Sequence, residues 1–462
     1  VLETVSVTKK RSLYLLAGLL AFFLGMFLRF GVGVYNDSEQ YISMHIHREP
    51  LYPLFLAFFR LFAKDRALAA AAVVQNVLTA YSIYALSEYL RKKFGLPVWE
   101  ELVIVAVQLA PHLMTKYVSA LGIFLENSVM SEALCIPLFE LYLLFLLRMI
   151  YEDSRSAGMV SLLLSLLLSL TRSQMMVTVL MWLIVQVVRS VLQKRFRRIL
   201  WSAAAVVLLF GARSLTTHIY NYGVTGYFMG NTYGKVNTLT NVIYACDPED
   251  GQVFAEGSLE RQFFDAFYEQ ADQIGANYRY GGDSFAERAE HLENCHDALK
   301  FEILEANLSA YYFGLGKVDY YQQSSMSDAM AGTMLKALLP VCFGQWLYDY
   351  ILLCTYGFVR SIAVVHPVIN WLALVLYAAA VLLTVWGYRQ KRARDAAILM
   401  SVALLFIVGN VCAASLTIMC LSRYMIYGFA PFYIALFLLG TAFAKEWRSR
   451  LHNKKREMEN RE

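Results

Sequence analysis

The segment 35–53, with the sequence YNDSEQYISMHIHREPLYP, gathers side chains that can do acid–base or metal chemistry. Asp37 and Glu39 stand two positions apart, as do His45 and His47. In an extended segment, side chains two positions apart point the same way, so we expect both carboxylates on one side. Such a pair suits a general base or a divalent cation, with His47 as a further ligand if a metal binds. The alternative for both histidines is a solvated interfacial position.

Composition places this segment in a membrane protein. Of the 462 residues, 58% are hydrophobic and 17% are charged, which leaves too little polar surface for a soluble globule. Lys and Arg form short clusters between apolar stretches, a pattern of membrane topology rather than of nucleic-acid binding. The cysteines show no spacing typical of a metal site. Cys246 and Cys295 lie in a polar region, where they can either pair in an oxidising exterior or stay free.

Apolar stretches of roughly 20 residues predict about ten transmembrane helices. The basic clusters put both termini in the cytoplasm and the segment 35–53 outside. Two apolar regions, 51–63 and 334–365, are short or interrupted, and we expect interfacial helices there. The expected spans are 13–30, 68–90, 102–115, 128–147, two within 159–188, 199–215, 368–388, 398–419 and 424–444.

The expected fold class is therefore an all-α polytopic membrane protein in three parts. An N-terminal transmembrane module, 1–220, carries the first outer loop at 34–67. A polar, acidic and α-rich extracytoplasmic domain follows at 221–332, where the composition changes sharply. The last part, 333–462, contains interfacial helices and the C-terminal spans.

Several arginines are expected at one level of the membrane, its outer boundary. A long arginine stem can lie in the apolar layer while its guanidinium reaches the headgroups, so snorkelling explains any one of them. Ionisable groups at membrane depth also mark substrate paths, and the guanidinium fork suits phosphate. Asp37, Arg172 and Arg423 are expected to line one cavity at the outer leaflet. The arginines at this level are Arg29, Arg60, Arg172, Arg213, Arg360 and Arg423.

Four short motifs follow one another in a recognisable order. After the acid pair comes REPLYP at 48–53, followed by SEAL at 131–134, LTR at 170–172 and SRY at 422–424 with Pro431. This series resembles the GT-C superfamily of integral-membrane glycosyltransferases, which includes bacterial aminoarabinose transferases and protein O-mannosyltransferases. The resemblance covers about 13–211 and the last span. The outer domain matches none of the better-known soluble domains, and many relatives have adjacent acids rather than Asp37-x-Glu39.

The resemblance implies a GT-C-like bundle and an inverting glycosyltransferase. A monosaccharide would pass from a polyprenyl-phosphate donor, such as undecaprenyl phosphate, to a hydroxyl of a glycan, glycolipid or protein outside a plasma membrane. Asp37 would be the base, and Glu39 its partner or a ligand. The donor phosphate would lie on Arg423, Arg172 and Arg48. Further substrate-binding or supporting residues would be His47, Tyr52, Glu126, Glu132, Arg60 and Tyr424.

Other interpretations stay open. Asp37 and Glu39 fit a solvated loop, Glu132 fits a helix N-terminus, and Tyr52 and Tyr424 fit an interfacial aromatic belt. A transporter or flippase of an anionic lipid-linked saccharide would use the same arginines without needing a base. An oligosaccharide polymerase or ligase would keep the enzyme class and change the reaction. The sequence requires no particular cofactor, and a divalent cation held by Asp37, Glu39 and His47 stays an open alternative.

Overall fold

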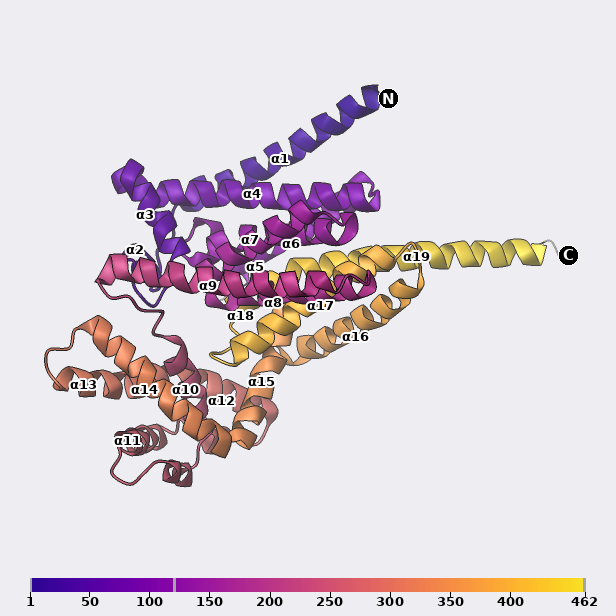
Figure 1. Cartoon of the computed structure of the whole chain (residues 1–462). Helices are drawn as coiled ribbons and strands as arrows, with labels where there is room; N and C mark the ends of the chain where they lie inside the picture. Colours follow the sequence, from indigo (N-terminus) through magenta and orange to yellow (C-terminus); the bar gives the residue numbers. More distant parts are fainter. Residues whose placement is uncertain (1, 119–121, 460–462) are drawn as a thin grey trace.

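The computed structural model describes residues 2–118 and 122–459, and this part of the chain is helical (Figure 1). The described residues contain no strand, and a single isolated bridge joins Gly33 to Ser128. The long apolar sequence stretches become the long helices of a bundle, as expected. These are α1 (Leu2–Phe30), α4 (Ala67–Phe94), α5 (Val98–Tyr117), α6 (Ser131–Glu152), α7 (Arg155–Thr171), α8 (Met176–Leu192), α9 (Arg197–Thr225), α16 (Pro367–Arg389), α17 (Arg394–Ser415) and α19 (Phe429–Glu459).

Eight helical stretches in the described chain are long and apolar enough to cross a membrane, so the multi-pass character holds. The count rises to nine if α14 (Tyr320–Val341) and α15 (Phe343–Ile362), which meet at 101°, form one broken span. The eight stretches are Lys10–Phe30, Leu51–Phe94, Ser131–Glu152, Ser173–Leu192, Arg197–Thr225, Pro367–Arg389, Arg394–Ser415 and Ser422–Asn453.

Two of the ten expected spans fall outside this set. The one at 102–115 lies in α5, whose buried polar side chains lower its mean hydropathy: Glu100, Glu101, Gln108 and His112. The first half of 159–188 lies in α7, which has 17 residues and is short for a crossing. The expected interfacial helix is α3 (Leu51–Ala63), which continues through η1 (Lys64–Arg66) into α4.

The core of the bundle lies around α6. In this helix 78% of the apolar window is buried, compared with 11% in α1 and 17% in α9 and α16. Large side chains fill the centre, such as Phe139 of α6 and Phe406 of α17, whose ring centroids are 4.3 Å apart. α6 therefore provides the fixed element on which polar side chains at its N-terminus can be positioned.

A second hydrophobic core defines an outer module below the bundle in Figure 1. It comprises α10 (Gly234–Tyr244), η4 (Pro248–Val253), α11 (Leu259–Gln273), α12 (Phe285–Asp297), the π-helix η6 (Ala298–Glu305) and α13 (Ala306–Gly314), with α14 and the first part of α15. The expected boundary at 332 falls inside α14, because its apolar second half continues into this core through Met334 and Leu338. Cys246 and Cys295 are both free thiols here.

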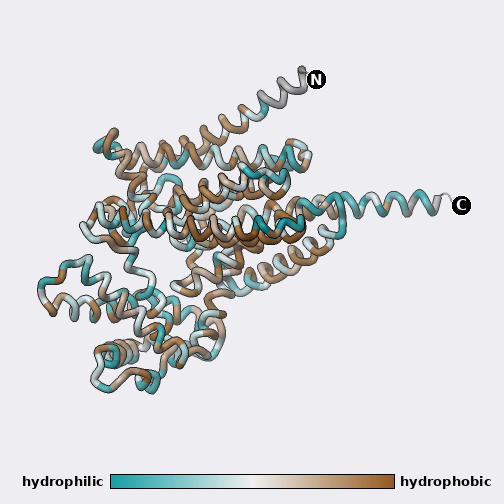
Figure 2. Tube along the Cα trace, in the orientation of Figure 1, coloured by the Kyte–Doolittle hydropathy of each residue, from teal (hydrophilic) through white to brown (hydrophobic). Residues whose placement is uncertain are grey.

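The start of α1 and the end of α19 lie on one side of the molecule, and the loop after α1 lies on the opposite side (Figure 1). Hydropathy follows the same division, with apolar helices between polar ends and a mixed outer module (Figure 2). Both termini therefore share one side of the bundle, as the charge pattern predicts.

The loop after α1 is held against the N-terminus of α6. Gly33 exchanges backbone hydrogen bonds with Asn127 and Val129, both at 2.9 Å. Ser38, in the short helix α2 (Ser38–Ile42), donates its hydroxyl to the Val129 carbonyl at 2.8 Å. These contacts bring residue 37 beside the first turn of α6.

Candidate functional site

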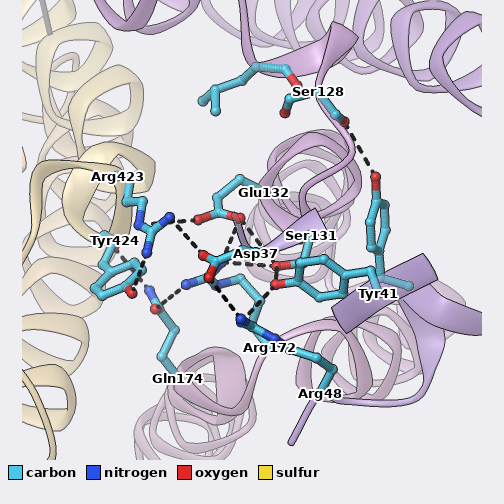
Figure 3. A network of polar contacts seen from close by, with 12 residues as sticks. Asp37, Tyr41, Arg48, Ser128, Ser131, Glu132, Arg172, Gln174, Arg423 and Tyr424 are labelled. Atoms are coloured by element: carbon cyan, nitrogen blue, oxygen red, sulfur yellow. Dashed lines mark hydrogen bonds and ion pairs between the residues drawn. The ribbon is translucent and has the colours of Figure 1, made fainter. Parts of the chain in front are cut away.

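Asp37 lies between two guanidinium groups from distant parts of the chain (Figure 3). Arg48 donates to its Oδ1 at 2.9 Å, and Arg423 donates to its Oδ2 at 3.0 Å. Arg48 follows α2 in the loop after α1, whereas Arg423 belongs to α18 (Ser422–Met425), just before the last helix. The carboxylate therefore ties the first loop to the start of the last span.

A second acid pairs with arginine beside the first. Glu132 Oε2 lies 2.7 Å from the Arg172 guanidinium, and Glu132 Oε1 lies 4.0 Å from Arg423 Nε. Glu132 is in the first turn of α6, where the helix dipole also favours a carboxylate. Arg172 stands at the break between α7 and η3 (Ser173–Met175). Asp37, Arg48, Glu132, Arg172 and Arg423 are called the site cluster below.

Hydroxyl groups connect the two halves of the site cluster. Ser131 Oγ accepts from Arg172 at 2.9 Å and lies 2.9 Å from the Tyr41 hydroxyl. That hydroxyl also accepts from Arg48 at 3.2 Å. The Arg48 guanidinium lies 4.7 Å from the centre of the Tyr41 ring. The Arg48 guanidinium is therefore held by hydrogen bonds at its edge and by the Tyr41 ring at its face, and these contacts fix its orientation.

Tyr424 and Gln174 position the remaining arginines. The Tyr424 ring centre lies 4.9 Å from the Arg172 guanidinium and 5.0 Å from that of Arg423. Gln174 accepts from Arg172 at 3.3 Å and donates to the Tyr424 carbonyl at 3.0 Å. The aromatic ring lies against both cations at once, which partly offsets their mutual repulsion.

The electrostatics of the site cluster favour an ionised Asp37. Burial alone would raise the pKa of this carboxyl, but the charges of Arg48 and Arg423 outweigh burial and hold the pKa below its ordinary value of 3.8. In the site cluster three guanidinium groups meet two carboxylates, so one positive charge is left without an acid partner within it. The cluster is suited to attract an anion.

A second buried ion pair supports the same loop. Glu49 pairs with Arg213 of α9 and accepts from the Ser173 hydroxyl at 2.8 Å. Burial raises the pKa of Glu49, and Arg213 and Ser173 oppose this effect. Through Glu49, the backbone beside Arg48 is attached both to α9 and to the break after α7.

Two cavities border the site cluster. An apolar cavity of about 540 Å³ has Arg360, Ser422 and Arg423 in its lining, together with apolar residues of α5 and α19 that include Met114 and Phe429. A cluster cavity of about 210 Å³ is lined by Arg48, Arg172, Glu49, Tyr41, Tyr424, His47 and Tyr233, among others. The single cavity expected for Asp37, Arg172 and Arg423 is therefore not found: Arg423 lines the apolar cavity, Arg172 lines the cluster cavity, and Asp37 is in the lining of neither.

Glu39 does not join Asp37, and the expected extended conformation of the segment is wrong. Asp37 is the N-cap of α2, and Glu39 is in the first turn of that helix with an exposed side chain. Residues two positions apart on a helix point to nearly opposite sides. The short helix forms because Ser38 is anchored to Val129, a contact that local spacing does not reveal.

The histidines pack against aromatic rings and hydroxyls. His47 stacks on Tyr233 with ring centroids 4.4 Å apart, and its Nε2 lies 3.0 Å from Ser324 Oγ in α14. Burial, with the nearby His45, lowers the pKa of His47 to about 3, so its ring is neutral at pH 7. Among the described residues no three His, Cys, Asp or Glu side chains are grouped to hold a metal, and Asp37, Glu39 and His47 do not converge.

The other predicted site residues have separate places. Tyr52 is fully buried and donates to Gln75 of α4 at 2.9 Å, while its ring packs on Tyr41. Glu126 is buried and pairs with His112 of α5. Arg60 is bonded to the Ile42 carbonyl at the surface, so it braces the loop rather than the site cluster.

The arginines that the sequence predicts at the outer boundary differ in their partners. Arg172 and Arg423 join the site cluster, and Arg213 pairs with Glu49. Arg360 of α15 forms a two-armed ion pair with Glu293 of α12 and so attaches the outer module to the bundle. Arg29 is exposed and lies over the Phe30 ring, which fits snorkelling.

Sequence reasoning did not single out Tyr41, Ser131 or Gln174, although Ser131 lies inside the motif SEAL and Gln174 follows LTR by two residues. Nor did it identify the residues of the outer module beside His47, since no local pattern places Tyr233 or Tyr320 near position 47. No protein-family model, curated protein or solved structure matches this chain.

Proposed function

We propose that this chain is an inverting glycosyltransferase that moves a monosaccharide from a polyprenyl-phosphate donor to an acceptor hydroxyl at the outer face of a plasma membrane. The observation that carries the proposal is the position of Asp37. Its carboxylate joins Arg48 to Arg423, and Arg423 in turn lines the apolar cavity. A base, a phosphate-binding cation and a space for a lipid are adjacent.

The apolar cavity fits a phospholipid-like donor. Most of its lining is apolar, from the end of α5, the segment after α15 and the residues around α18, and its charged groups are Arg360 and Arg423. A polyprenyl chain would lie on the apolar side and place its phosphate at Arg423. The guanidinium forks are the groups best suited to phosphate oxygens. Arg172 Nε and Arg423 Nε are buried and donate to no described residue, so they have hydrogen bonds to offer an anion.

In the proposed reaction Asp37 takes the proton of the acceptor hydroxyl while that oxygen bonds to C1 of the sugar. The bond from C1 to the phosphate oxygen breaks on the opposite side, and its electron pair leaves with the phosphate. Negative charge grows on this phosphate, and a fixed cation at that place is worth about 3 kcal/mol by comparison with other preorganised donors. Arg423 and Arg172 are the fixed cations.

The ion pairs of Asp37 give the base a dependence on the donor. Without substrate, Arg48 and Arg423 lower its pKa and make it a weak base. A donor phosphate would share Arg423 with Asp37 and add negative charge nearby. Both effects raise the pKa of Asp37, so the base would strengthen when the donor is bound.

The deciding experiment is Asp37→Asn, assayed with a polyprenyl-phosphate-linked monosaccharide that is radiolabelled in the sugar. We expect the transfer rate to fall by a factor of about 100 to 10,000, the usual contribution of a general base. Glu39→Gln is the matched control, because its side chain is exposed on the other side of α2. Near-normal transfer by Asp37→Asn would overturn the assignment.

Two further readouts separate the alternatives. Passage of the intact labelled lipid across vesicles without a new glycosidic bond would identify a transporter or flippase. Products extended by whole oligosaccharide blocks would identify a polymerase or ligase. The proposed topology, with both termini cytoplasmic, requires that a cysteine introduced at Glu39 reacts with a membrane-impermeant reagent from outside the cell.

A further inference from the structure

A third cavity lies in the outer module and adjoins the site. This module cavity has a volume of about 260 Å³ and is lined by residues of α10, η6, α13 and α14. It shares two lining residues, His47 and Tyr233, with the cluster cavity. His47 directly precedes Arg48, which holds Asp37 at 2.9 Å. The module cavity therefore adjoins the cluster cavity, whose lining includes Arg48, the partner of the proposed base, and it lies in a part of the chain that the proposed donor site does not use.

The rings in this lining differ in how much of them is covered. Tyr233 is enclosed, because His47 stacks on it and the Lys300 ammonium lies 3.7 Å from its ring centre. Tyr320 and Phe301 are open, with 42% and 46% of their surfaces exposed. Two open rings on the wall of a small cavity provide an apolar face for a ligand ring.

The other lining groups are polar and mostly uncharged. Gln323 donates to Ser327 at 2.8 Å, and Ser324 lies 2.7 Å from the Thr232 hydroxyl. The one acid in the lining is Glu305, whose Oε1 is buried and accepts from no described residue. Burial raises the pKa of Glu305, and the neighbouring Lys300 opposes the rise. A carboxylate with an unused oxygen suits a ligand that donates hydrogen bonds.

The backbone around Lys300 and Glu305 is a π-helix, η6, in which hydrogen bonds close from i to i+5. The wider turn brings residues five apart, as these two are, toward the same side. Lys300 is 3% exposed and lies against the Tyr233 and Phe301 rings. Burial lowers its pKa to about 8. Such π-turns are uncommon and frequently mark functional sites.

We propose that the module cavity is the acceptor site and takes a neutral hydroxylated ring compound, a sugar or a polyol. Its apolar C–H face would lie on Tyr320 and Phe301, and its hydroxyls would donate to Glu305 and bond to Gln323 and the serines. One hydroxyl would extend past the stacked His47 and Tyr233 rings, which line both cavities, toward Asp37. The role of this ligand as the acceptor rests on the proposed function, whereas the binding of a sugar or polyol does not.

The test is a binding measurement on the purified full chain in nanodiscs, without donor. The probes are methyl glucoside, methyl mannoside and myo-inositol, observed by saturation-transfer NMR. We expect binding that weakens by about tenfold or more in Tyr320→Ala and in Glu305→Gln, the equivalent of one strong contact. Matched controls are Tyr280→Ala, an exposed tyrosine elsewhere in the module, and Glu302→Gln, an exposed acid on the same π-helix. Both controls should bind as the unchanged chain does.

Failure of binding by all three probes would overturn the inference, as would equal binding by Glu305→Gln, Tyr320→Ala and the controls. Asp37→Asn separates the two proposals, because it should bind the probes normally and fail in transfer. Probe binding that depends on Glu305 without any sugar transfer would defeat the glycosyltransferase and keep the site. Transfer that depends on Asp37 but on neither Tyr320 nor Glu305 would keep the enzyme and defeat the acceptor site.

Discussion

Two clusters of acids and arginines lie toward opposite ends of α4, and they are built differently. The terminal cluster, at the C-terminal end of α4, consists of Glu88, Arg91, Lys92, Glu101 and Arg11. In it, Glu88 is bound by Arg91 at 2.8 Å and Lys92 at 2.9 Å, three and four residues further along the same helix. Arg91 also reaches Glu101, which pairs with Arg11. Much of this cluster follows from helix geometry alone.

Apart from Asp37–Arg48, which lies within one loop, the pairs of the site cluster join distant segments of the chain. Asp37 meets Arg423 across 386 positions, and Glu132 meets Arg172 from a different helix. Arg48, Arg172 and Arg423 each also line a cavity. Ordering charges from four distant segments around empty space is costly. The contrast indicates that the terminal cluster fastens helix ends, whereas the site cluster is arranged for a ligand.

The largest difference between the clusters is expected in stability. Glu132→Gln leaves the Arg172 guanidinium with hydrogen bonds but no paired acid, and breaking a buried pair in this way costs about 3–5 kcal/mol. Glu88→Gln is the matched change, and Arg91 still keeps Glu101 at 3.5 Å. Its cost is expected to be smaller than that of Glu132→Gln, because Arg91 keeps an acid partner and the Lys92 side chain, 64% exposed, reaches water. Thermal unfolding in detergent compares them, and equal losses would erase the distinction.

The next effect is on activity. Arg423→Lys keeps a positive charge but loses the fork that binds Asp37 and the proposed phosphate, so transfer should fall by about 100-fold or more. Arg91→Lys makes the same chemical change in the terminal cluster and should leave transfer within a few-fold. The measurement is the initial rate with the labelled donor. A comparable loss of transfer in both variants would mean that both clusters affect the rate only by stabilising the fold.

A pH series sharpens the comparison at the level of Asp37. Because its pKa in the folded chain lies below 3.8, ionised Asp37 stabilises the fold at every pH above that value. This contribution is lost as the pH falls through the lowered pKa. The unfolding temperature of Asp37→Asn should therefore lie below that of the unchanged chain at neutral pH, and the gap should close in acid. A gap that widens on acidification would contradict the sign of the pKa shift.

The sequence predicts the grouping of the site better than its details, for a physical reason. Asp37, Glu132, Arg172 and Arg423 each stand at the end of an apolar stretch, and the charge rule places all four ends on one side. Topology alone therefore brings them near one another. Their actual partners depend on loop conformation, as the Ser38 anchor to Val129 shows, and the sequence contains no local sign of it.

The sequence predicts the number of membrane spans and the contacts within the outer module less well, for a related reason. α5 carries Glu100 and Glu101 on a helix that packs into the protein, so hydropathy alone cannot define its relation to a membrane. In the module, Lys300 and Glu305 act together only because η6 is a π-helix. In an α-helix, the side chains of these two residues would point in different directions. Backbone choices of this kind are decided by tertiary packing.

The smallest expected effect is that of Glu39→Gln, and it is informative for that reason. Glu39 has the same charge as Asp37, lies two residues away, and differs mainly in facing solvent from α2. Its replacement should change stability by less than about 0.5 kcal/mol, as for most surface positions, and leave transfer unchanged. The role of Asp37 would then depend on its contacts with Arg48 and Arg423 and not on its position in the sequence. A loss of transfer as large as that in Asp37→Asn would instead require the first loop to rearrange on donor binding, so that both acids reach the substrate.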